Sequence, residues 1–333
     1  MVRTLPQLID GLDQRVWRLP HVIMIMGKGG VGKTTVGLRL AIELARLGRR
    51  VLLASLDPAG HLLEYLGLPG PLREVEAAPG IRAIQYEVDG LARKVAEEYS
   101  LLLRRLMPGL QALGVEDVVE TVREAPGFEE EVFLRILSSL YERRDVDVVI
   151  VDMPPTGIAL RVVALPRLHL FWVERLRELR EKIVSIKYAI ANALGRHAEA
   201  DDPVLRRLEE LRSRYQGLLG EIEDPLRTSV VAVATPEPLP VYEVSVIAKK
   251  LQEHRVALKM IVANRVLGER AQQLGLEEME RQALTRLEEI RCSLRPSPSL
   301  AVIAHMSRPP SSLRDAEALG DYILKIKHGC KRE

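Results

Sequence analysis

A glycine-rich stretch that ends in a lysine and two threonines carries the strongest chemical signal in the chain. Residues 27 to 35 spell GKGGVGKTT, with the spacing of a P-loop. Backbone N–H groups must approach phosphate oxygens closely, and glycine permits this because it has no Cβ and tolerates positive φ. In such a loop Lys33 reaches the β and γ phosphates, and the Thr34 hydroxyl ligates Mg²⁺. The predicted nucleotide-binding residues of this loop are Gly27, Lys28, Gly29, Gly30, Val31, Gly32, Lys33, Thr34 and Thr35.

The residues on either side supply the strand and the helix that a P-loop requires. An apolar run of strand length precedes the loop at 22 to 26, and a helical pattern follows it over 34 to 47. The alternative is a glycine-rich turn without a ligand, and the strand, loop and helix context disfavours it. The sequence therefore predicts ATP and Mg²⁺ as the ligands of this segment.

Two further apolar runs are each followed by an aspartate. Residues 51 to 54 lead to Asp57, and residues 148 to 151 lead directly to Asp152. Ligands bind outside the carboxyl ends of the strands in a doubly wound sheet, so we expect both carboxylates beside the P-loop. Asp152 has the Walker B arrangement and would hold Mg²⁺ through water, together with Thr34. For Asp57, an ordinary Asp-Pro-Ala turn is the alternative.

The second lysine of the loop, Lys28, resembles the deviant Walker A signature of a group of dimeric ATPases. The group includes the arsenical-pump, tail-anchored-protein targeting, Min/Par and nitrogenase iron-protein ATPases. In that group this lysine crosses a two-fold interface and contacts the nucleotide of the other subunit. The resemblance implies a homodimer in which Lys28 and Lys33 stabilise charge on the phosphates and hydrolysis is tied to dimer closure. A solvated loop lysine is the alternative for Lys28 alone.

Three other strings resemble the arsenical-pump and targeting branch of this group. DPAGHLL at 57 to 63 resembles switch I, which implies that Asp57 orients the attacking water. DMPPTGIALRVVALP at 152 to 166 resembles switch II, although Met153 and Pro154 depart from its pattern; the matching residues include Asp152, Pro155, Thr156 and Gly157. Asn264 follows the apolar run of the segment 257 to 267, where the family contacts adenine with an asparagine. A strand-end turn is the alternative for Asn264.

Two long segments with a helical pattern, 86 to 144 and 167 to 222, interrupt the alternation of predicted strands and helices. We predict an α/β fold, a P-loop NTPase with a mostly parallel doubly wound sheet and an inserted helical subdomain. The ATPase domain would comprise 1–85, 145–166 and 226–333, and the helical subdomain 86–144 and 167–225. The second helical stretch carries apolar residues at helical spacing, which are Trp172, Leu176, Leu179, Ile183, Ile186 and Ile190.

The resemblance implies that this subdomain binds a client. In the targeting ATPases an apolar groove formed by both subunits holds a transmembrane helix, which passes to a membrane receptor. The alternative is that the apolar stripes only pack the helices together. We expect a targeting factor for tail-anchored membrane proteins; the alternatives are the ATPase subunit of an arsenite pump, for which two distant cysteines give no thiolate cluster, and a Min/Par-like positioning ATPase. An iron protein would need paired cysteines for its cluster.

Composition excludes several other classes of protein. Net charge is only +2, so no basic field indicates a nucleic-acid partner. The first twenty residues lack the apolar core of a signal peptide, and about 18 consecutive apolar residues occur nowhere, so we expect a cytoplasmic protein without a membrane span. Cys292 and Cys330 stand 38 positions apart without a neighbouring ligand motif, which predicts neither a disulfide nor a zinc site.

Overall fold

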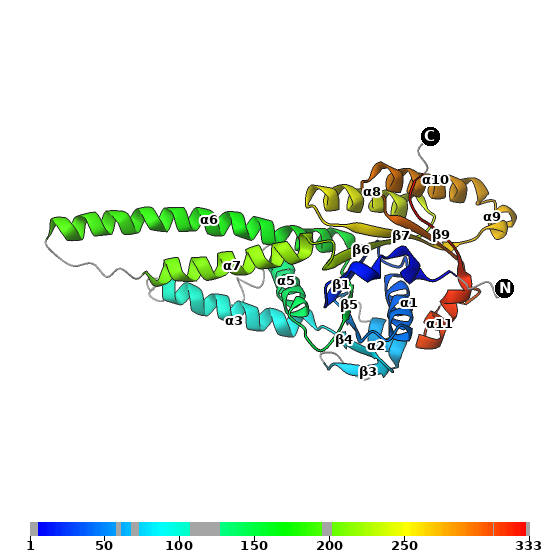
Figure 1. Cartoon of the computed structure of the whole chain (residues 1–333), viewed down its shortest axis with the longest axis horizontal. Coiled ribbons are helices and arrows are strands. Elements are labelled where there is room, and N and C mark those ends of the chain that lie inside the picture. Colours follow the sequence, from blue (N-terminus) through cyan, green and yellow to red (C-terminus); the bar gives the residue numbers. More distant parts are fainter. Residues whose placement is uncertain are drawn as a thin grey trace.

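Nine strands of the described residues form one central sheet in a computed structural model of the chain, which describes residues 6–57, 61–67, 73–106, 127–194, 202–308 and 310–330. The strand order is β3-β4-β2-β5-β1-β6-β7-β8-β9 (Figure 1). Only the two edge strands, β3 and β9, pair antiparallel. The strands are β1 His21–Met26, β2 Val51–Ser55, β3 Val75–Ala78, β4 Ile81–Gln85, β5 Val148–Asp152, β6 Thr228–Ala234, β7 Leu258–Val266, β8 Ser299–Ala304 and β9 Ile323–Lys327. The predicted α/β fold with a mostly parallel sheet is therefore confirmed.

Helices cover both faces of this sheet. Strands β1, β2, β5 and β6 are buried along their whole length, as strands covered on both faces must be. One face packs on α1 (Lys33–Arg46), α2 (His61–Leu66) and α11 (Leu313–Ala318). The other face packs on α3 (Val88–Leu106), α5 (Phe128–Tyr141), α6 (Thr156–Ala193), α7 (Pro203–Glu223), α8 (Pro238–Glu253) and α10 (Glu277–Ser293). A short helix, α9 (Glu269–Gln273), precedes α10.

A long helical hairpin extends away from the sheet (Figure 1). Its first helix, α6, has 38 residues and begins at Thr156, so it continues without a break through Pro166. The second helix, α7, begins at Pro203, and the Asp202 side chain accepts hydrogen bonds from the Val204 and Leu205 amides. The predicted boundary between the ATPase domain and the helical subdomain, between residues 166 and 167, stays a prediction.

The two helices of the hairpin differ in how they use their apolar residues. On α7, Leu208, Tyr215 and Ile222 are buried against the rest of the chain. On α6, each residue of the predicted stripe is between 47% and 60% exposed; these residues are Trp172, Leu176, Leu179, Ile183, Ile186 and Ile190. We define these six together with Leu168, which is 50% exposed, as the α6 stripe. Among the described residues, the apolar residues of α7 thus pack inside the protein, whereas the α6 stripe remains exposed.

Helix α6 also bears on the question of a membrane span. Among the described helices it is the one long and apolar enough to cross a membrane by length and composition, with a mean hydropathy of 1.3 over its most apolar 18-residue window. A third of that window is buried inside the protein. A core helix meets the same criteria, so a single helix of this kind is weak support for a span.

The apolar residues from 313 to 326 have helical spacing, but this segment does not form one helix. Helix α11 ends at Ala318, a 3₁₀ turn covers Leu319–Tyr322, and β9 then pairs with β8. Gly320 and Asp321 are poor helix residues and interrupt the pattern. The helical spacing of the remaining apolar residues is therefore misleading, because Ile323 is buried as part of a strand.

The expectation that the cysteines stay unpaired is also wrong. Cys292, at the end of α10, is disulfide-bonded to Cys330, which follows β9. The separation of 38 residues gave no sign of this contact, because it arises only when β9 folds back beside β8.

We expect the disulfide to stabilise the fold. A disulfide that closes a loop of this length lowers the entropy of the unfolded chain, which stabilises the folded protein by up to about 4 kcal/mol. Cys292→Ser should therefore lower the free energy of unfolding under non-reducing conditions, and a reducing agent should lower that of the wild-type protein equally. The reducing agent should have no effect on the variant, and an effect of equal size there would contradict the prediction.

A buried histidine gives the fold a defined pH dependence. The His21 ring stacks on Trp17, and its Nδ1 and Nε2 lie 3.0 Å from the Leu226 carbonyl oxygen and 2.9 Å from the Ser229 hydroxyl. The carbonyl can only accept, so Nδ1 carries the proton. Burial lowers the pKa of His21 from 6.5 to about 4, against the opposing effect of the Leu226 hydrogen bond.

The unfolded chain therefore binds the additional proton first as the pH falls. Stability that His21 contributes is complete above its unfolded pKa of 6.5 and is lost as the pH falls toward 4. Between about pH 7 and about pH 5 the loss should be about 2 kcal/mol. Urea unfolding at both pH values should show that the free energy of unfolding falls with pH in both proteins. The fall in the wild-type protein should exceed that in His21→Gln by about 2 kcal/mol. An identical pH dependence in both proteins would refute the assignment.

Candidate nucleotide site

The P-loop connects the carboxyl end of β1 to the first turn of α1. Gly29 and Gly30 are exposed, and no atom lies within 4 Å of the place where a Cβ on either would stand. Lys33 is the first residue of α1, so the positive end of the helix dipole faces the same space. The loop thus offers glycine backbone, a helix N-terminus and open room, which together suit a phosphate chain.

Two glycines of the loop are required by close contacts. A Cβ on Gly27 would stand 2.2 Å from the Val233 carbonyl oxygen in the neighbouring strand β6. A Cβ on Gly32 would stand 2.4 Å from Nδ2 of Asn264, and Gly32 has φ of 97°. Any side chain at either position would displace the loop from the end of the sheet.

Lys33 and Asp57 meet beside the loop. The Lys33 amine lies 3.6 Å from an Asp57 carboxylate oxygen, and the Lys33 side chain is only 5% exposed. Asp57 follows β2, and its carbonyl oxygen accepts a hydrogen bond of 3.0 Å from the Gln85 side chain at the end of β4. Residues 58 to 60 of the predicted switch I lie outside the described residues, and residues 61 to 63 begin α2. The strand ends therefore bring a buried cation and a carboxylate to the edge that carries the P-loop.

Thr34 and Asp152 form a pair of oxygen ligands beside the P-loop. The Thr34 hydroxyl donates a hydrogen bond of 2.6 Å to an Asp152 carboxylate oxygen. Asp152 is buried at the end of β5, and its carbonyl oxygen accepts the Leu56 amide at 2.9 Å, which joins the ends of β5 and β2. A hydroxyl and a carboxylate are the hard ligands that Mg²⁺ prefers, so this pair fits the metal that the P-loop implies.

Asn264 lies against the loop from β7. Its amide nitrogen donates to the Val31 carbonyl oxygen at 2.8 Å, and its amide oxygen accepts the Arg265 amide at 3.0 Å. The Asn264 side chain is only 4% exposed, and in this structure its hydrogen bond to Val31 holds the P-loop against β7. Contact with adenine stays a prediction for this residue.

Switch II begins directly after Asp152 and becomes the first turn of α6. Met153 and Pro154 are buried, and Pro155 is the residue before the helix. The Thr156 hydroxyl donates a hydrogen bond of 2.7 Å to the Glu243 carboxylate on α8. Because α6 is one continuous helix, the end of switch II and the α6 stripe belong to the same element.

The structure adds two side chains that the sequence analysis missed. Gln85 contacts the backbone of Asp57, and Glu243 contacts Thr156. Gln85 ends a parallel strand at the edge of the P-loop, so the rule that located Asp57 applies to it as well. Glu243 lies in the middle of a helix, where no local pattern indicates a role.

Comparison with known proteins agrees with this arrangement. The family model of ArsA ATPases, described as anion-transporting ATPases, matches residues 20–302. A protein of Aquifex aeolicus named as a candidate arsenical pump-driving ATPase is 28% identical over 275 residues, which cover 80% of this chain and 88% of that protein. An ATPase get3 of Pyrenophora tritici-repentis is 29% identical over 273 residues, 79% of this chain and 77% of that protein.

A third relative shows the same similarity over part of a longer protein. The arsenical pump-driving ATPase of Acidiphilium multivorum is 29% identical over 262 residues, which cover 75% of this chain and 40% of that protein. The family match spans strands β1 to β7, the P-loop and both switch segments described above. The predicted family is confirmed: the chain is a member of the ArsA ATPase family.

Proposed function

We propose that this chain is an Mg²⁺-dependent ATPase that works as a homodimer and carries the transmembrane helix of tail-anchored membrane proteins. The exposed α6 stripe, on a helix that starts in switch II, is the observation that carries the client-binding part. The ATPase part follows from the family and from the residues gathered at the P-loop.

The geometry of the site supports a hydrolytic role for each of four residues. Lys33 stabilises negative charge on the β and γ phosphates, and Asp57, within ion-pair distance of it, orients the attacking water. Thr34 and Asp152 hold Mg²⁺, which neutralises phosphate charge when bound. Lys33 then exchanges its contact with Asp57 for the phosphates, which leaves that carboxylate for the water.

The position of Lys28 is the evidence for the homodimer. Its side chain is half-buried in the loop, and within the described parts of the chain it forms no ion pair. A lysine at this place is available to the nucleotide of a second subunit. Dimer closure then becomes part of the hydrolytic cycle, and the two α6 helices are brought together by the same step.

The dimensions of the α6 stripe favour a transmembrane helix as the client. From Leu168 to Ile190 the stripe is about 33 Å long at the rise of an α-helix. The hydrocarbon core of a bilayer, and so the apolar part of a spanning helix, is about 30 Å. A groove lined by two such stripes would cover an apolar helix along its length. We therefore assign the protein to the cytoplasm, where it would pass the client to a membrane receptor.

The arsenite-pump alternative has less support. Arsenite requires a cluster of thiolates, whereas both cysteines of this chain are bonded to each other at the far edge of the sheet. A Min/Par-like role would leave the α6 stripe without an occupant.

Nucleotide-dependent capture tests the proposal. A tagged tail-anchored transmembrane peptide would be incubated with the Asp57→Asn variant and ATP, with wild-type protein and ATP, and with each protein alone. We expect the variant to retain the peptide, because it closes on ATP without hydrolysing it, and the wild-type protein to release the peptide after hydrolysis. Failure to retain the peptide in any nucleotide state, while wild-type ATPase is intact, would refute targeting.

A further inference from the structure

Basic side chains border the α6 stripe on both sides. Successive residues of an α-helix are about 100° apart, which places Arg175 and Lys182 along one border of the stripe. The same spacing places Arg180 and Lys187 along the other border. We call these four residues the basic border. The acidic residues of this part of α6 point away from the stripe; they are Glu174, Glu178 and Glu181.

Two members of the basic border already have carboxylate partners within the chain. Arg175 lies 2.9 Å from one carboxylate oxygen and Arg180 lies 2.8 Å from another. Lys182 and Lys187 are exposed, and neither forms an ion pair with any residue that the structure describes. These two lysines therefore carry the positive charge that is open to a ligand.

The two lysines lie on the part of α6 that extends past α7. Arg180 pairs with Asp202, the residue directly before α7, so α7 begins beside Arg180. Residues 181 to 193 of α6 continue beyond that point (Figure 1). A ligand on the α6 stripe can therefore approach both lysines without displacing α7.

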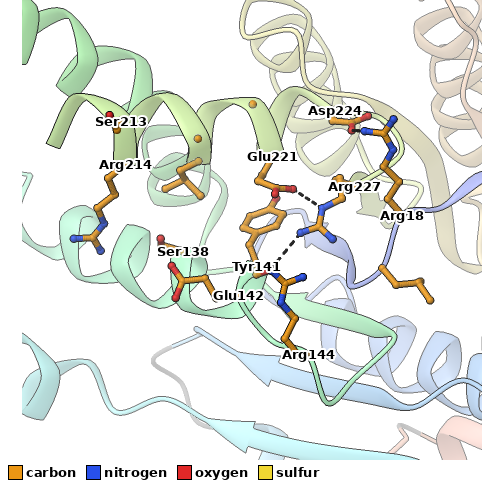
Figure 2. Close-up of a pocket in the computed structure, with 14 residues that line it drawn as sticks. Arg18, Ser138, Tyr141, Glu142, Arg144, Ser213, Arg214, Glu221, Asp224 and Arg227 are labelled. Carbon is orange, nitrogen blue, oxygen red and sulfur yellow. Dashed lines mark hydrogen bonds and ion pairs between the residues drawn. The ribbon is translucent and has the colours of Figure 1, made fainter. Parts of the chain in front are cut away.

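The other end of the hairpin is tied to the sheet by paired charges. Figure 2 shows Glu221 of α7 paired with Arg227, which precedes β6. It also shows Asp224, at the end of α7, paired with Arg18 at 3.3 Å. The Arg227 guanidinium donates a further hydrogen bond of 3.3 Å to the Tyr141 carbonyl oxygen. The base of the hairpin is thus anchored, and the two lysines of the basic border lie near its far end.

A second copy of the α6 stripe is a poor occupant for this surface. If two α6 helices packed directly stripe to stripe, each basic border would face a basic border of the other helix, whether the helices ran parallel or antiparallel. Like charges placed against each other across an interface oppose association. The basic border therefore disfavours direct packing of the two stripes and favours a helix that brings carboxylates.

We propose that the α6 stripe selects apolar helices with acidic residues at the end that lies beside Lys182 and Lys187. This inference rests on the proposed function, in which a transmembrane helix occupies the stripe. Charged residues are rare within a membrane-spanning segment, so the carboxylates of the client would follow its apolar part. Lys187 lies within one turn of Ile190, the last residue of the stripe, and a lysine side chain extends along apolar surface to place its amine at the edge.

Competitive capture of two peptides measures this preference. Both peptides would have the same apolar segment of about 20 residues, one with two glutamates at each end and the other with two lysines. They would be mixed in equal amounts with the Asp57→Asn protein and ATP. We expect at least about fivefold more of the glutamate peptide to be retained. The preference should fall in high salt, because exposed charges are screened.

Charge reversal on the protein identifies the residues responsible. Lys182→Glu together with Lys187→Glu, in the Asp57→Asn protein, should reverse the preference between the two peptides. Lys249→Glu together with Lys325→Glu changes the net charge equally at exposed lysines on α8 and β9, and should leave the preference unchanged. All four lysines are exposed, so the melting temperature should be the same in both double variants.

The outcomes separate this inference from the proposed function. Equal retention of the two peptides, or the same preference after reversal of Lys182 and Lys187, would overturn the inference and leave the targeting role in place. Retention of neither peptide would contradict the targeting role itself, and the inference with it.

Discussion

Replacing Lys33 by methionine should lower the rate of ATP hydrolysis by about 10³-fold. The lysine is buried beside the P-loop, 3.6 Å from Asp57, so methionine keeps the volume and removes the charge that the transferred phosphoryl group needs. Asp152→Asn should have a similar effect, because a neutral amide replaces the carboxylate that lies 2.6 Å from the Thr34 hydroxyl and so weakens Mg²⁺ binding. Phosphate release at ATP and Mg²⁺ concentrations that just saturate the wild-type protein measures both variants.

The control for this experiment is an exposed lysine outside the site. Lys249→Met, on α8, should hydrolyse ATP at the wild-type rate. Added Mg²⁺ should partly restore Asp152→Asn, whose metal site is weakened, and should not restore Lys33→Met. Hydrolysis by Lys33→Met within a few-fold of wild type would contradict the assigned role of the lysine.

Placing two charges on the α6 stripe should abolish client capture and leave basal hydrolysis intact. In the double variant Ile183→Asp and Ile186→Asp, two carboxylates would have to be desolvated against an apolar helix, which costs several kcal/mol. Both residues are already exposed, at 47% and 60%, so the fold should tolerate the change. We expect retention of a transmembrane peptide by the ATP-bound protein to fall at least about a hundredfold.

A charge on another face of the same helix provides the control. Ser185 is exposed and lies outside the α6 stripe, so Ser185→Asp should retain the peptide normally. Melting temperature and basal ATPase activity should be unchanged in both proteins. Equal capture by the double variant and by Ser185→Asp would show that the stripe is not the client surface.

The residues around the P-loop could be predicted because the information is local. The loop from Gly27 to Thr35, the strand before it and the helix after it are consecutive in the chain, and the fold confirms the strand and helix. Ligands gather at the carboxyl ends of parallel strands, and this rule correctly predicted that Asp57 and Asp152, from distant segments, lie at the same edge of the sheet.

Features that depend on tertiary contacts escaped prediction. The contact between Thr156 and Glu243 joins two helices far apart in the chain, and the bond between Cys292 and Cys330 forms only because β9 pairs with β8. Periodicity also could not decide whether an apolar stripe is buried. The stripes of α6 and α7 are alike in sequence, yet Ile222 is 1% exposed and Ile186 is 60% exposed.

Photocrosslinking from the α6 stripe tests the central claim most directly. A benzophenone amino acid would replace Ile183 in one protein and Ser185 in a second, both with Asp57→Asn, and each would be irradiated with a tail-anchored transmembrane peptide in ATP or in ADP. The account predicts a crosslink to the peptide from position 183, in ATP, and little from position 185 or in ADP. Crosslinks of equal yield from both positions, or from 183 irrespective of nucleotide, would contradict it.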